Sequence, residues 1–375
     1  MTFLPGLSKS FLKKKQWLPS SVQHDDLFDI RISNLVAARG RARKSVVPNV
    51  FTGPGHRLAN HLLLQEKPMK NIIISDIHGN ADALLAVLKE VAEKEEGVDR
   101  ILVAGDIVGY GASPNECCDI VRYLVYGRRK VALERIESIA ALSYSDASQQ
   151  ELLLKALLLL ENKGTSIGGN HDREAIGEPS LTSEMNPVAK TAVDWTAGVL
   201  SKENVKFLRR LSLRMKFGKE DFEVVHSTPS YPRGYEYVKN AGVLKYNSLW
   251  SQLTLGGHTH RPSAYIYTKE IRTVNASVLM PCDSYDMRLM LIEKQSTNKV
   301  ESFAIEQGKG WKYYVNVGSV GQPRDGNPQA SYVLFDSQSK QITFKRVAYN
   351  TEAASGKILA AKLPNELSQR VLKGV

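Results

Sequence analysis

The stretch Ile-Ile-Ile-Ser-Asp-Ile-His-Gly-Asn at residues 72–80 constrains the fold more than any other part of the chain. Its run of β-branched apolar residues suits a strand in the middle of a sheet that is covered on both faces. The run ends at Asp76 and His78, which then stand at the carboxyl end of the strand, where open α/β sheets hold their functional residues. These two side chains can offer an oxygen and a nitrogen to one cation. Taken alone, an Asp and a His at this spacing are a weak signal, and such a pair is more often a helix cap and its hydrogen-bond partner.

The same pattern, a short apolar strand followed by a residue able to bind a metal ion, is predicted five times along the chain. The metal-competent residues at these strand ends are Asp76, His78, Asp106, Asn170, His226, His258 and His260. With His171, five of the eight histidines fall at these ends, and the other three all fall in the N-terminal tail. A satisfied core histidine would explain any one of them, but it does not explain their joint placement.

The mixture of side chains narrows the kind of metal site. Carboxylate, imidazole and amide ligands together suit divalent transition ions such as manganese, iron or zinc better than magnesium or calcium. Seven side chains are too many for one ion, but they suffice for two ions if one carboxylate bridges, and paired ions about 3.5 to 4 Å apart are a standard arrangement for displacement at phosphorus. Glycines before Asp106, Asn170 and His258 let the backbone turn tightly, so that the side chains can converge.

The positive charge of the chain is concentrated in its N-terminal tail. Residues 1–70 hold twelve Lys and Arg against four Asp and Glu, so +8 of the net +11 lies there. We interpret residues 1–68 as a basic, partly ordered extension and residues 69–375 as the main domain. The extension is either a solvated arm or an arm that contacts RNA, DNA or an acidic partner.

The composition of the chain argues against a membrane protein, a secreted protein and a disulfide-rich protein. The longest strongly apolar run, residues 152–160, contains Lys155 and is about half the length that a membrane-spanning helix needs, so no membrane association is predicted. The first residues lack the order of a secretory signal, and a cytoplasmic location is predicted, although the acid-poor start leaves organellar targeting open. Three cysteines are too few for a disulfide framework, and we expect them to be reduced and buried.

From residue 71 onward the pattern becomes regular. Asn80 is placed to cap a helix, and residues 100–104 then form a second buried strand, so a β-α-β unit is predicted. Residues 127–164 are predicted to be an insertion of two helices, which either pack on a core of their own, form a dimer contact or cover the site. Strands are predicted at 165–168, 222–225 and 253–255. Later alternating segments, at 264–267, 288–292, 313–317, 331–335 and 342–347, predict a second sheet.

Five motifs, in this order, resemble the calcineurin-like metallophosphoesterase superfamily. They are Asp-x-His at 76–78, Gly-Asp at 105–106, Gly-Asn-His-Asp at 169–172, the single His226, and Gly-His-x-His at 257–260. Further stretches near 109–116, 186–196, 316–326 and 363–374 resemble a prokaryotic phosphodiesterase-type branch of it. The resemblance covers residues 69–375 but not the tail, and not clearly the insertion. It implies an α/β fold of two stacked mixed β-sheets flanked by helices, a four-layer sandwich, with a helical insertion.

The resemblance also implies roles for individual residues. Asp76, His78 and His260 would hold one ion, Asn170, His226 and His258 the other, and Asp106 would bridge. A hydroxide shared by the ions would attack phosphorus in line. Of the ions, manganese is expected first, with iron, zinc, nickel or cobalt as alternatives. His171 would protonate the leaving oxygen, and Asp172 would either orient His171 or simply cap the following helix.

One departure from the superfamily pattern bears on the substrate. Ser/Thr protein phosphatases and symmetrical dinucleotide tetraphosphatases of this superfamily usually continue Gly-Asp with a further Asp-Arg pair, whereas residues 109–110 here are Gly-Tyr. The predicted substrate-binding residues are Asn80, Arg173, Arg261 and Arg324, although each arginine equally suits a loop brace.

Three functions follow from this reading. The first is a phosphoesterase acting on a phosphodiester or a small phosphomonoester. The second is a dinucleoside polyphosphate hydrolase or a protein phosphatase, and the third is a non-enzymatic scaffold of the same fold. A homo-oligomer through the helical insertion is also predicted.

Overall fold

The computed structural model describes residues 69–375 apart from 145, 179–184, 240–242, 245–250, 270–284, 291–300 and 309. The chain divides into two units, Met1–Leu63 and Leu64–Val375, and every element described below belongs to the second. The predicted basic extension, residues 1–68, lies outside the described residues, and its boundary and its partners stay predictions.

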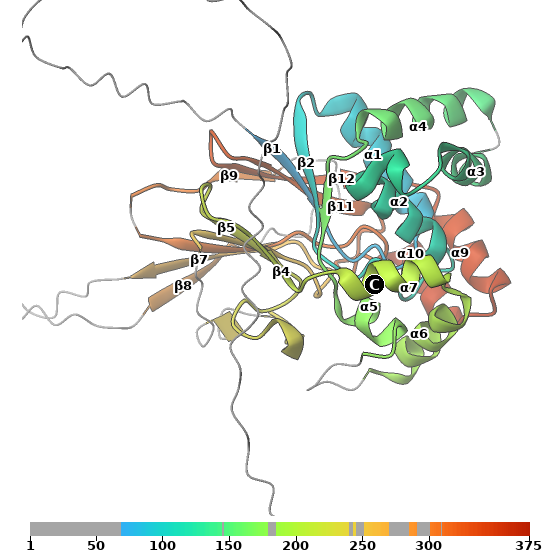
Figure 1. Ribbon diagram of the computed structural model, residues 1–375. Helices are drawn as coiled ribbons and strands as arrows, with labels where there is room; N and C mark the ends of the chain where they lie inside the picture. Colours follow the sequence, from blue (N-terminus) through green and yellow to red (C-terminus); the bar gives the residue numbers. More distant parts are fainter. Residues whose placement is uncertain are drawn as a thin grey trace, which may run out of the picture. The chain divides into compact units, whose positions relative to one another are not determined.

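The first sheet is built around the strand that the sequence singles out (Figure 1). This strand, β1, pairs in parallel with β2 and in antiparallel with β11, so it lies in the interior of the sheet as predicted. The strands, in spatial order, are β3 (Gly164–Ser166), β2 (Val98–Val103), β1 (Lys70–Ile74), β11 (Ala330–Asp336), β12 (Gln341–Val347) and β9 (Glu301–Ala304).

The second sheet is also mixed. Its central strands β5, β6 and β10 run parallel, and antiparallel strands flank them on both sides. The strands, in spatial order, are β4 (Arg214–Phe217), β5 (Phe222–Val225), β6 (Leu253–Gly256), β10 (Lys312–Asn316), β7 (Ser263–Lys269) and β8 (Tyr285–Met290).

Helices gather on the outer side of the first sheet (Figure 1). Asn80 caps α1 as predicted, because its side chain accepts a hydrogen bond from the backbone N–H of Ala83. The helices are α1 (Ala81–Lys94), α2 (Pro114–Tyr126), α3 (Leu133–Ser143), α4 (Ala147–Leu159), α5 (Asn170–Ala175), α6 (Pro187–Val199), α7 (Lys202–Arg210), α9 (Thr351–Ala360) and α10 (Asn365–Lys373), with short 3₁₀ turns at Gly127–Arg129 and Pro232–Gly234.

The apolar run of β1 is explained by two cores, one on each face of the first sheet. Ile72 and Ile74 pack with α1 and α2 in the helical core. Ile73 points to the other face and packs against Phe222 and Val315 of the second sheet. Since both faces are covered, successive residues of β1 are all apolar instead of alternating. The predicted fold, two stacked mixed sheets flanked by helices, is confirmed.

Two details of the predicted sheet arrangement are wrong. The predicted strands at 331–335 and 342–347 belong to the first sheet, where β11 and β12 form a hairpin beside β1, and not to the second. Both faces of β11 are covered, so its sequence pattern carries no information about which sheet it joins. Strands β4 and β9 were not predicted.

The insertion forms two helices as predicted, but it does not have a core of its own. Ile136 and Ile139 of α3 and Leu153 and Leu157 of α4 pack into the same core as α1 and α2. Helix α4 also presents exposed leucines, among them Leu159 at 62% exposure. The homo-oligomer predicted through this insertion stays a prediction.

We expect the chain from Lys67 onward to fold without the preceding residues. All strands of both sheets lie downstream, and the described contacts begin at Met69, whose backbone N–H donates to Ser337 Oγ at 3.1 Å. The truncated chain should therefore unfold cooperatively at a melting temperature close to that of the full chain, as measured by circular dichroism. Failure to fold would mean that apolar residues between Trp17 and Leu35 belong to the core.

Candidate metal centre

The predicted metal ligands follow strands whose carboxyl ends point to one edge of the sheets. β1, β2 and β3 run parallel in the first sheet, and β5 and β6 run parallel in the second. The loops after these strands bring all seven predicted ligands together, each 8% exposed or less. The carboxylates and imidazoles form three overlapping groups, Asp76 with His78 and His260, Asp106 with His226 and His258, and His78 with Asp106 and His171. The first two groups contain predicted ligands alone, and the third joins them and includes His171.

In the first group, two imidazole nitrogens face each other beside a carboxylate. His78 Nε2 and His260 Nε2 lie 3.0 Å apart, and they lie 3.7 and 3.3 Å from Oδ1 of Asp76. Each Nδ1 faces a backbone carbonyl, of Val108 at 3.2 Å and of Gln322 at 2.6 Å, so it carries the proton that it donates. In the neutral rings, both Nε2 atoms then hold lone pairs. Three acceptors that face one another fit a cation, in the orientation that metal-bound histidines usually take.

The second group repeats this arrangement. His226 Nδ1 donates to the carbonyl of Ala104 at 2.8 Å. Its Nε2 lies 3.2 Å from Oδ1 of Asn170 and 3.2 Å from Oδ2 of Asp106. In a neutral ring, Nε2 would present a lone pair to two oxygens, and a cation between them would satisfy all three.

His258 links the two groups across the sheets. Its Nε2 donates to the carbonyl of Tyr235 at 2.7 Å, which leaves Nδ1 for the metal group. Its backbone N–H donates to the carboxylate of Asp76 at 2.9 Å. A predicted ligand from the first sheet therefore fixes the position of one from the second.

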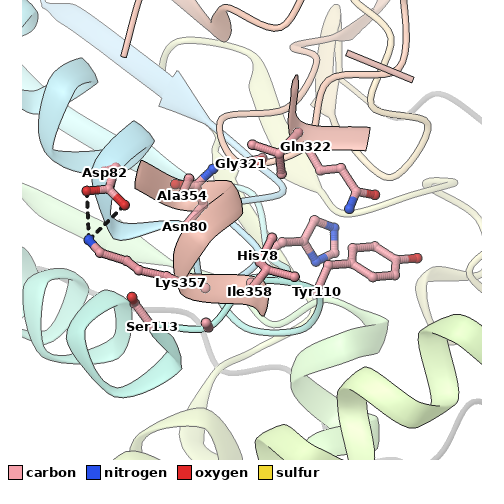
Figure 2. Close-up of a pocket in the computed structure, with 14 residues that line it drawn as sticks. His78, Asn80, Asp82, Tyr110, Ser113, Gly321, Gln322, Ala354, Lys357 and Ile358 are labelled. Carbon is pink, nitrogen blue, oxygen red and sulfur yellow. Dashed lines mark hydrogen bonds and ion pairs between the residues drawn. The ribbon is translucent and has the colours of Figure 1, made fainter. Parts of the chain in front are cut away.

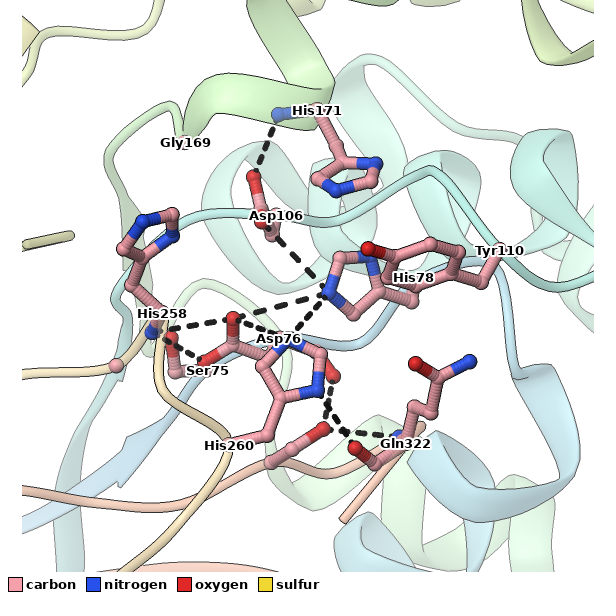
Figure 3. Close-up of polar contacts among 12 residues, drawn as sticks. Ser75, Asp76, His78, Asp106, Tyr110, Gly169, His171, His258, His260 and Gln322 are labelled. Atoms are coloured by element: carbon pink, nitrogen blue, oxygen red, sulfur yellow. Dashed lines mark hydrogen bonds and ion pairs between the residues drawn. The ribbon is translucent and has the colours of Figure 1, made fainter. Parts of the chain in front are cut away.

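Asp106 belongs to the second group and also lies beside His78 of the first (Figure 3). Its Oδ1 accepts a hydrogen bond from the backbone N–H of His171 at 2.9 Å. Its Oδ2 lies 3.2 Å from His226 Nε2 and 3.6 Å from His78 Nε2, yet it is buried and accepts no hydrogen bond of normal geometry. A buried carboxylate oxygen that faces imidazoles, without a hydrogen bond from the described residues, suits a metal ligand.

The pKa values of these groups are shifted by burial and by one another. Burial alone would raise the pKa of Asp106, but the charges of His226 and His171 hold it well below its usual range. Burial opposes charge on His226 as well, but Asp106 raises the pKa of this imidazole to about 9. Burial, with the charge of His226, lowers the pKa of His258 to about 3. The raised pKa of His226 means that a proton on this ring would balance part of the carboxylate charge, and a metal ion would compete with that proton.

The backbone at the predicted ligands is strained. A positive φ is unusual for residues other than glycine and costs free energy that the surrounding structure must supply. Five of the seven predicted ligands have a positive φ: Asp76 at 53°, His78 at 49°, Asp106 at 53°, His258 at 69° and His260 at 59°. The strain lies where the predicted ligands converge, which indicates that the loops are shaped for the site and not for their own stability.

Two glycines allow the loops to approach so closely. A Cβ at Gly169 would collide with Oδ1 of Asp106 and would lie 2.6 Å from the backbone nitrogen of the same residue. A Cβ at Gly257 would collide with Ser75 Oγ and with the carboxylate of Asp76. Both positions therefore exclude any side chain, and the reason is close approach and not a tight turn, because neither glycine has a positive φ. Of the three glycines that the sequence predicted to turn the backbone tightly, Gly105 is the one with a positive φ, at 93°.

His171 lies beside Asp106 and His78, but Asp172 does not contact its ring. The Nδ1 atom of His171 is buried without a hydrogen-bond partner, and burial holds the pKa of this imidazole well below its usual value. The two carboxylate oxygens of Asp172 accept from the backbone N–H groups of Val108 at 3.1 Å and Gly169 at 2.9 Å. Asp172 thus caps α5, and within the described part of the chain it does not orient His171.

The four predicted substrate-binding residues have different surroundings. The Asn80 side chain makes structural hydrogen bonds with both polar atoms of its amide. Its oxygen caps α1, and its nitrogen donates to the carbonyl of Gly321 at 2.9 Å. Arg173 braces a loop through Glu178 and the carbonyl of Leu211. Arg261 is exposed and donates to the carbonyl of Arg324. Of the three arginines, Arg324 is the one packed next to the histidines of the site, through Tyr110.

Two residues at the site were not singled out from the sequence. The ring of Tyr110 lies 4.5 Å from the rings of both His78 and His171, and the carbonyl of Gln322 holds His260. Both fall in stretches that support the family resemblance, Gly-Tyr-Gly at 109–111 and residues 316–326. Tyr110 and Gln322 also line a pocket with His78, and the ion pair of Asp82 with Lys357 is part of the lining of the same pocket (Figure 2).

The chain combines a two-sheet α/β fold with a buried cluster of carboxylates and imidazoles at the strand ends, side chains that suit a divalent metal ion. Residues 69–262, more than half of the chain, match the family described as calcineurin-like phosphoesterase. The chain therefore belongs to the calcineurin-like phosphoesterase family.

Individual relatives agree with this assignment. The uncharacterized protein MJ0912 of Methanocaldococcus jannaschii is 31% identical over 304 residues, which cover 80% of this chain and 97% of the relative. The crystal structure of a metallophosphoesterase from Sphaerobacter thermophilus is 32% identical and covers 82% of this chain and 100% of its own, with a TM-score of 0.56. The hypothetical protein PH1004 of Pyrococcus horikoshii, 18% identical with a TM-score of 0.51, covers 82% of this chain and 99% of its own and supports the fold alone. Within the described residues, none of the helices has the length and apolar character needed to cross a membrane.

Replacing Gly169 by alanine should empty the metal site. The added methyl group would occupy the place of Asp106 Oδ1, so either the carboxylate or the α5 loop must move. We expect Gly169→Ala to lose most of its bound metal, as measured by elemental analysis of protein purified without chelators. Gly198→Ala in α6 is the matched control, since nothing lies within 4 Å of its added methyl group. Wild-type metal content in Gly169→Ala would contradict the proposed position of Asp106.

Proposed function

We propose that this protein is a metal-dependent phosphoesterase that hydrolyses a phosphodiester or a small phosphomonoester. The observation that carries the proposal is the pair of acceptor groups on either side of Asp106. In each group, imidazole nitrogens and carboxylate or amide oxygens face one another at 3.0 to 3.7 Å. The other ring nitrogens of His226 and His260 donate hydrogen bonds to backbone carbonyls. Such an arrangement is stabilised by cations and fits two of them.

In this proposal, each side chain has one task. Asp76, His78 and His260 would hold one divalent ion, Asn170, His226 and His258 would hold a second, and Asp106 would be available to both. When bound, the ions lower the pKa of a water molecule and neutralise the oxygens of the phosphoryl group. The mixed nitrogen and oxygen donors favour manganese, with iron, zinc, nickel and cobalt as alternatives.

His171 is proposed to protonate the leaving oxygen. Its backbone N–H is fixed by Asp106, and its Nδ1 has no partner within the described residues, so the ring is free to hold a proton for the substrate. Burial disfavours the charged ring, and a bound phosphoryl group would favour it. The proton would then be held only while substrate is present, which suits a general acid.

The metal content tests the centre directly. We expect close to two transition ions per chain in protein purified without chelators, because seven donors are available around one shared carboxylate. Asp106→Asn keeps the shape of the side chain but removes its charge, so it should lose most of the metal. Elemental analysis of both proteins gives the answer. Asp194→Asn, which makes the same change at an exposed carboxylate of α6, is the matched control.

A wild-type protein without bound metal, and without activity that metal stimulates, would contradict the proposal. A substrate panel with manganese then separates the activities. It compares a bis-aryl phosphodiester, an aryl monophosphate, a diadenosine polyphosphate and a phosphopeptide. Turnover of the first two supports the proposal. Turnover of only the last two would favour the alternatives, and no turnover at all would favour a scaffold.

His171→Ala should reduce turnover about 10²- to 10⁴-fold, the range typical of a lost general acid. The loss should be smallest for esters whose leaving group has a low pKa, because such groups leave without a proton. Metal content should remain at the wild-type value. If the metal is lost together with activity, His171 is a ligand and its proposed role is wrong.

A further inference from the structure

Tyr110 lies at the centre of the site although it is no predicted metal ligand. It follows β2 in the loop that carries Asp106, and it is 3% exposed. Its ring lies 4.5 Å from the rings of His78 and His171, so it covers one predicted metal ligand and the proposed general acid together (Figure 3).

Arg324 joins Tyr110 through its guanidinium group. The group lies 5.5 Å from the centre of the Tyr110 ring, and one of its nitrogens donates to the Tyr110 hydroxyl at 3.1 Å. The same nitrogen donates to Oε1 of Gln322 at 3.2 Å. Because a guanidinium group can only donate, both oxygens are acceptors in these bonds.

Two hydrogen-bond donors are therefore left over. The Tyr110 hydroxyl, which accepts from Arg324, still has its own proton to donate. The Gln322 amide is fixed with its oxygen toward Arg324, so its Nε2 faces away, and this atom is buried without a partner. Within the described residues, the Gln322 amide nitrogen and the Tyr110 hydroxyl proton are therefore two donors beside a cation that a bound anion could satisfy.

Arg324 also reaches the other half of the site. It interacts with the side chain of Tyr237, whose ring stacks on His258 at 4.0 Å and 18°. One cation thus connects an aromatic ring packed on His78 with an aromatic ring packed on His258. Arg324 is therefore separated from a predicted ligand of each metal group by one aromatic ring, Tyr110 on the side of His78 and Tyr237 on the side of His258.

We infer that Tyr110 and Arg324 form a phosphoryl-binding unit, in which the Tyr110 hydroxyl and the Arg324 guanidinium bind oxygens of the substrate phosphate and Gln322 positions Arg324. The inference rests on the proposed function. Accepting a hydrogen bond from a cation strengthens the hydroxyl as a donor, so the two residues act as one unit. The group that they bind is an anion with several oxygen acceptors, as in a phosphate ester or inorganic phosphate.

Calorimetric titration of inorganic phosphate into the manganese-loaded protein tests the unit without relying on turnover. Tyr110→Phe keeps the ring and removes the hydroxyl, and Arg324→Lys keeps the charge but loses the planar fork. Each should weaken phosphate binding about tenfold or more, as expected for one lost hydrogen bond to a charged group, with metal content unchanged. The double variant should bind only slightly more weakly than either single variant, because the residues act together.

Two matched variants serve as controls. Tyr123→Phe removes the hydroxyl of another buried tyrosine, in the helical core, and Arg128→Lys alters an arginine paired with Glu161 on the surface. Both should bind phosphate like the wild type. The KM for a bis-aryl phosphodiester should rise in Tyr110→Phe and Arg324→Lys but not in the controls.

Wild-type phosphate affinity in both Tyr110→Phe and Arg324→Lys would overturn the inference. Loss of metal from both variants would also overturn it, because the two residues would then hold the metal ligands in place instead of binding phosphate. If the wild type hydrolyses esters while the variants bind phosphate normally, only this inference fails. If the variants bind phosphate more weakly but the wild type hydrolyses none of the esters, only the proposed function fails.

Discussion

The buried charge of Asp106 is the constraint on which the rest of the site depends. Its side chain is 1% exposed, and an ionised carboxylate taken out of water costs several kcal/mol unless opposite charge or hydrogen bonds compensate. One oxygen is held by a backbone N–H, and the other faces imidazoles without a proper hydrogen bond. Only a cation close to that oxygen, either a proton on His226 or a metal ion, makes this arrangement stable.

The two sheets hold the strained loops in place around that charge. Ile73, Phe222 and Val315 form part of the core between the sheets, and this core fixes the strand ends relative to one another. The backbone of His258, from the second sheet, is tied to the carboxylate of Asp76, from the first. Positive φ angles at five predicted ligands would be unfavourable in free loops, so packing free energy maintains a geometry that the loops alone would not adopt.

Much of this could be predicted from the sequence, because the informative residues are local. The apolar run of β1 predicts an interior strand, and polar residues directly after several strands predict a shared edge. Other features depend on distant packing. The placement of β11 beside β1, the use of Asp172 as a cap and the brace made by Arg173 follow from contacts between residues far apart in the chain. The role inferred for Tyr110 likewise depends on the hydrogen bond that its hydroxyl accepts from Arg324, which lies over two hundred residues later in the chain.

The most direct test of a shared carboxylate is a crystal structure of the manganese-loaded protein with anomalous scattering data. We expect two anomalous peaks about 3.5 to 4 Å apart, one on each side of Asp106, with an oxygen of this carboxylate bound to both. The ring of His171 should lie outside both coordination spheres. A single peak, or two peaks that do not share Asp106, would contradict the account.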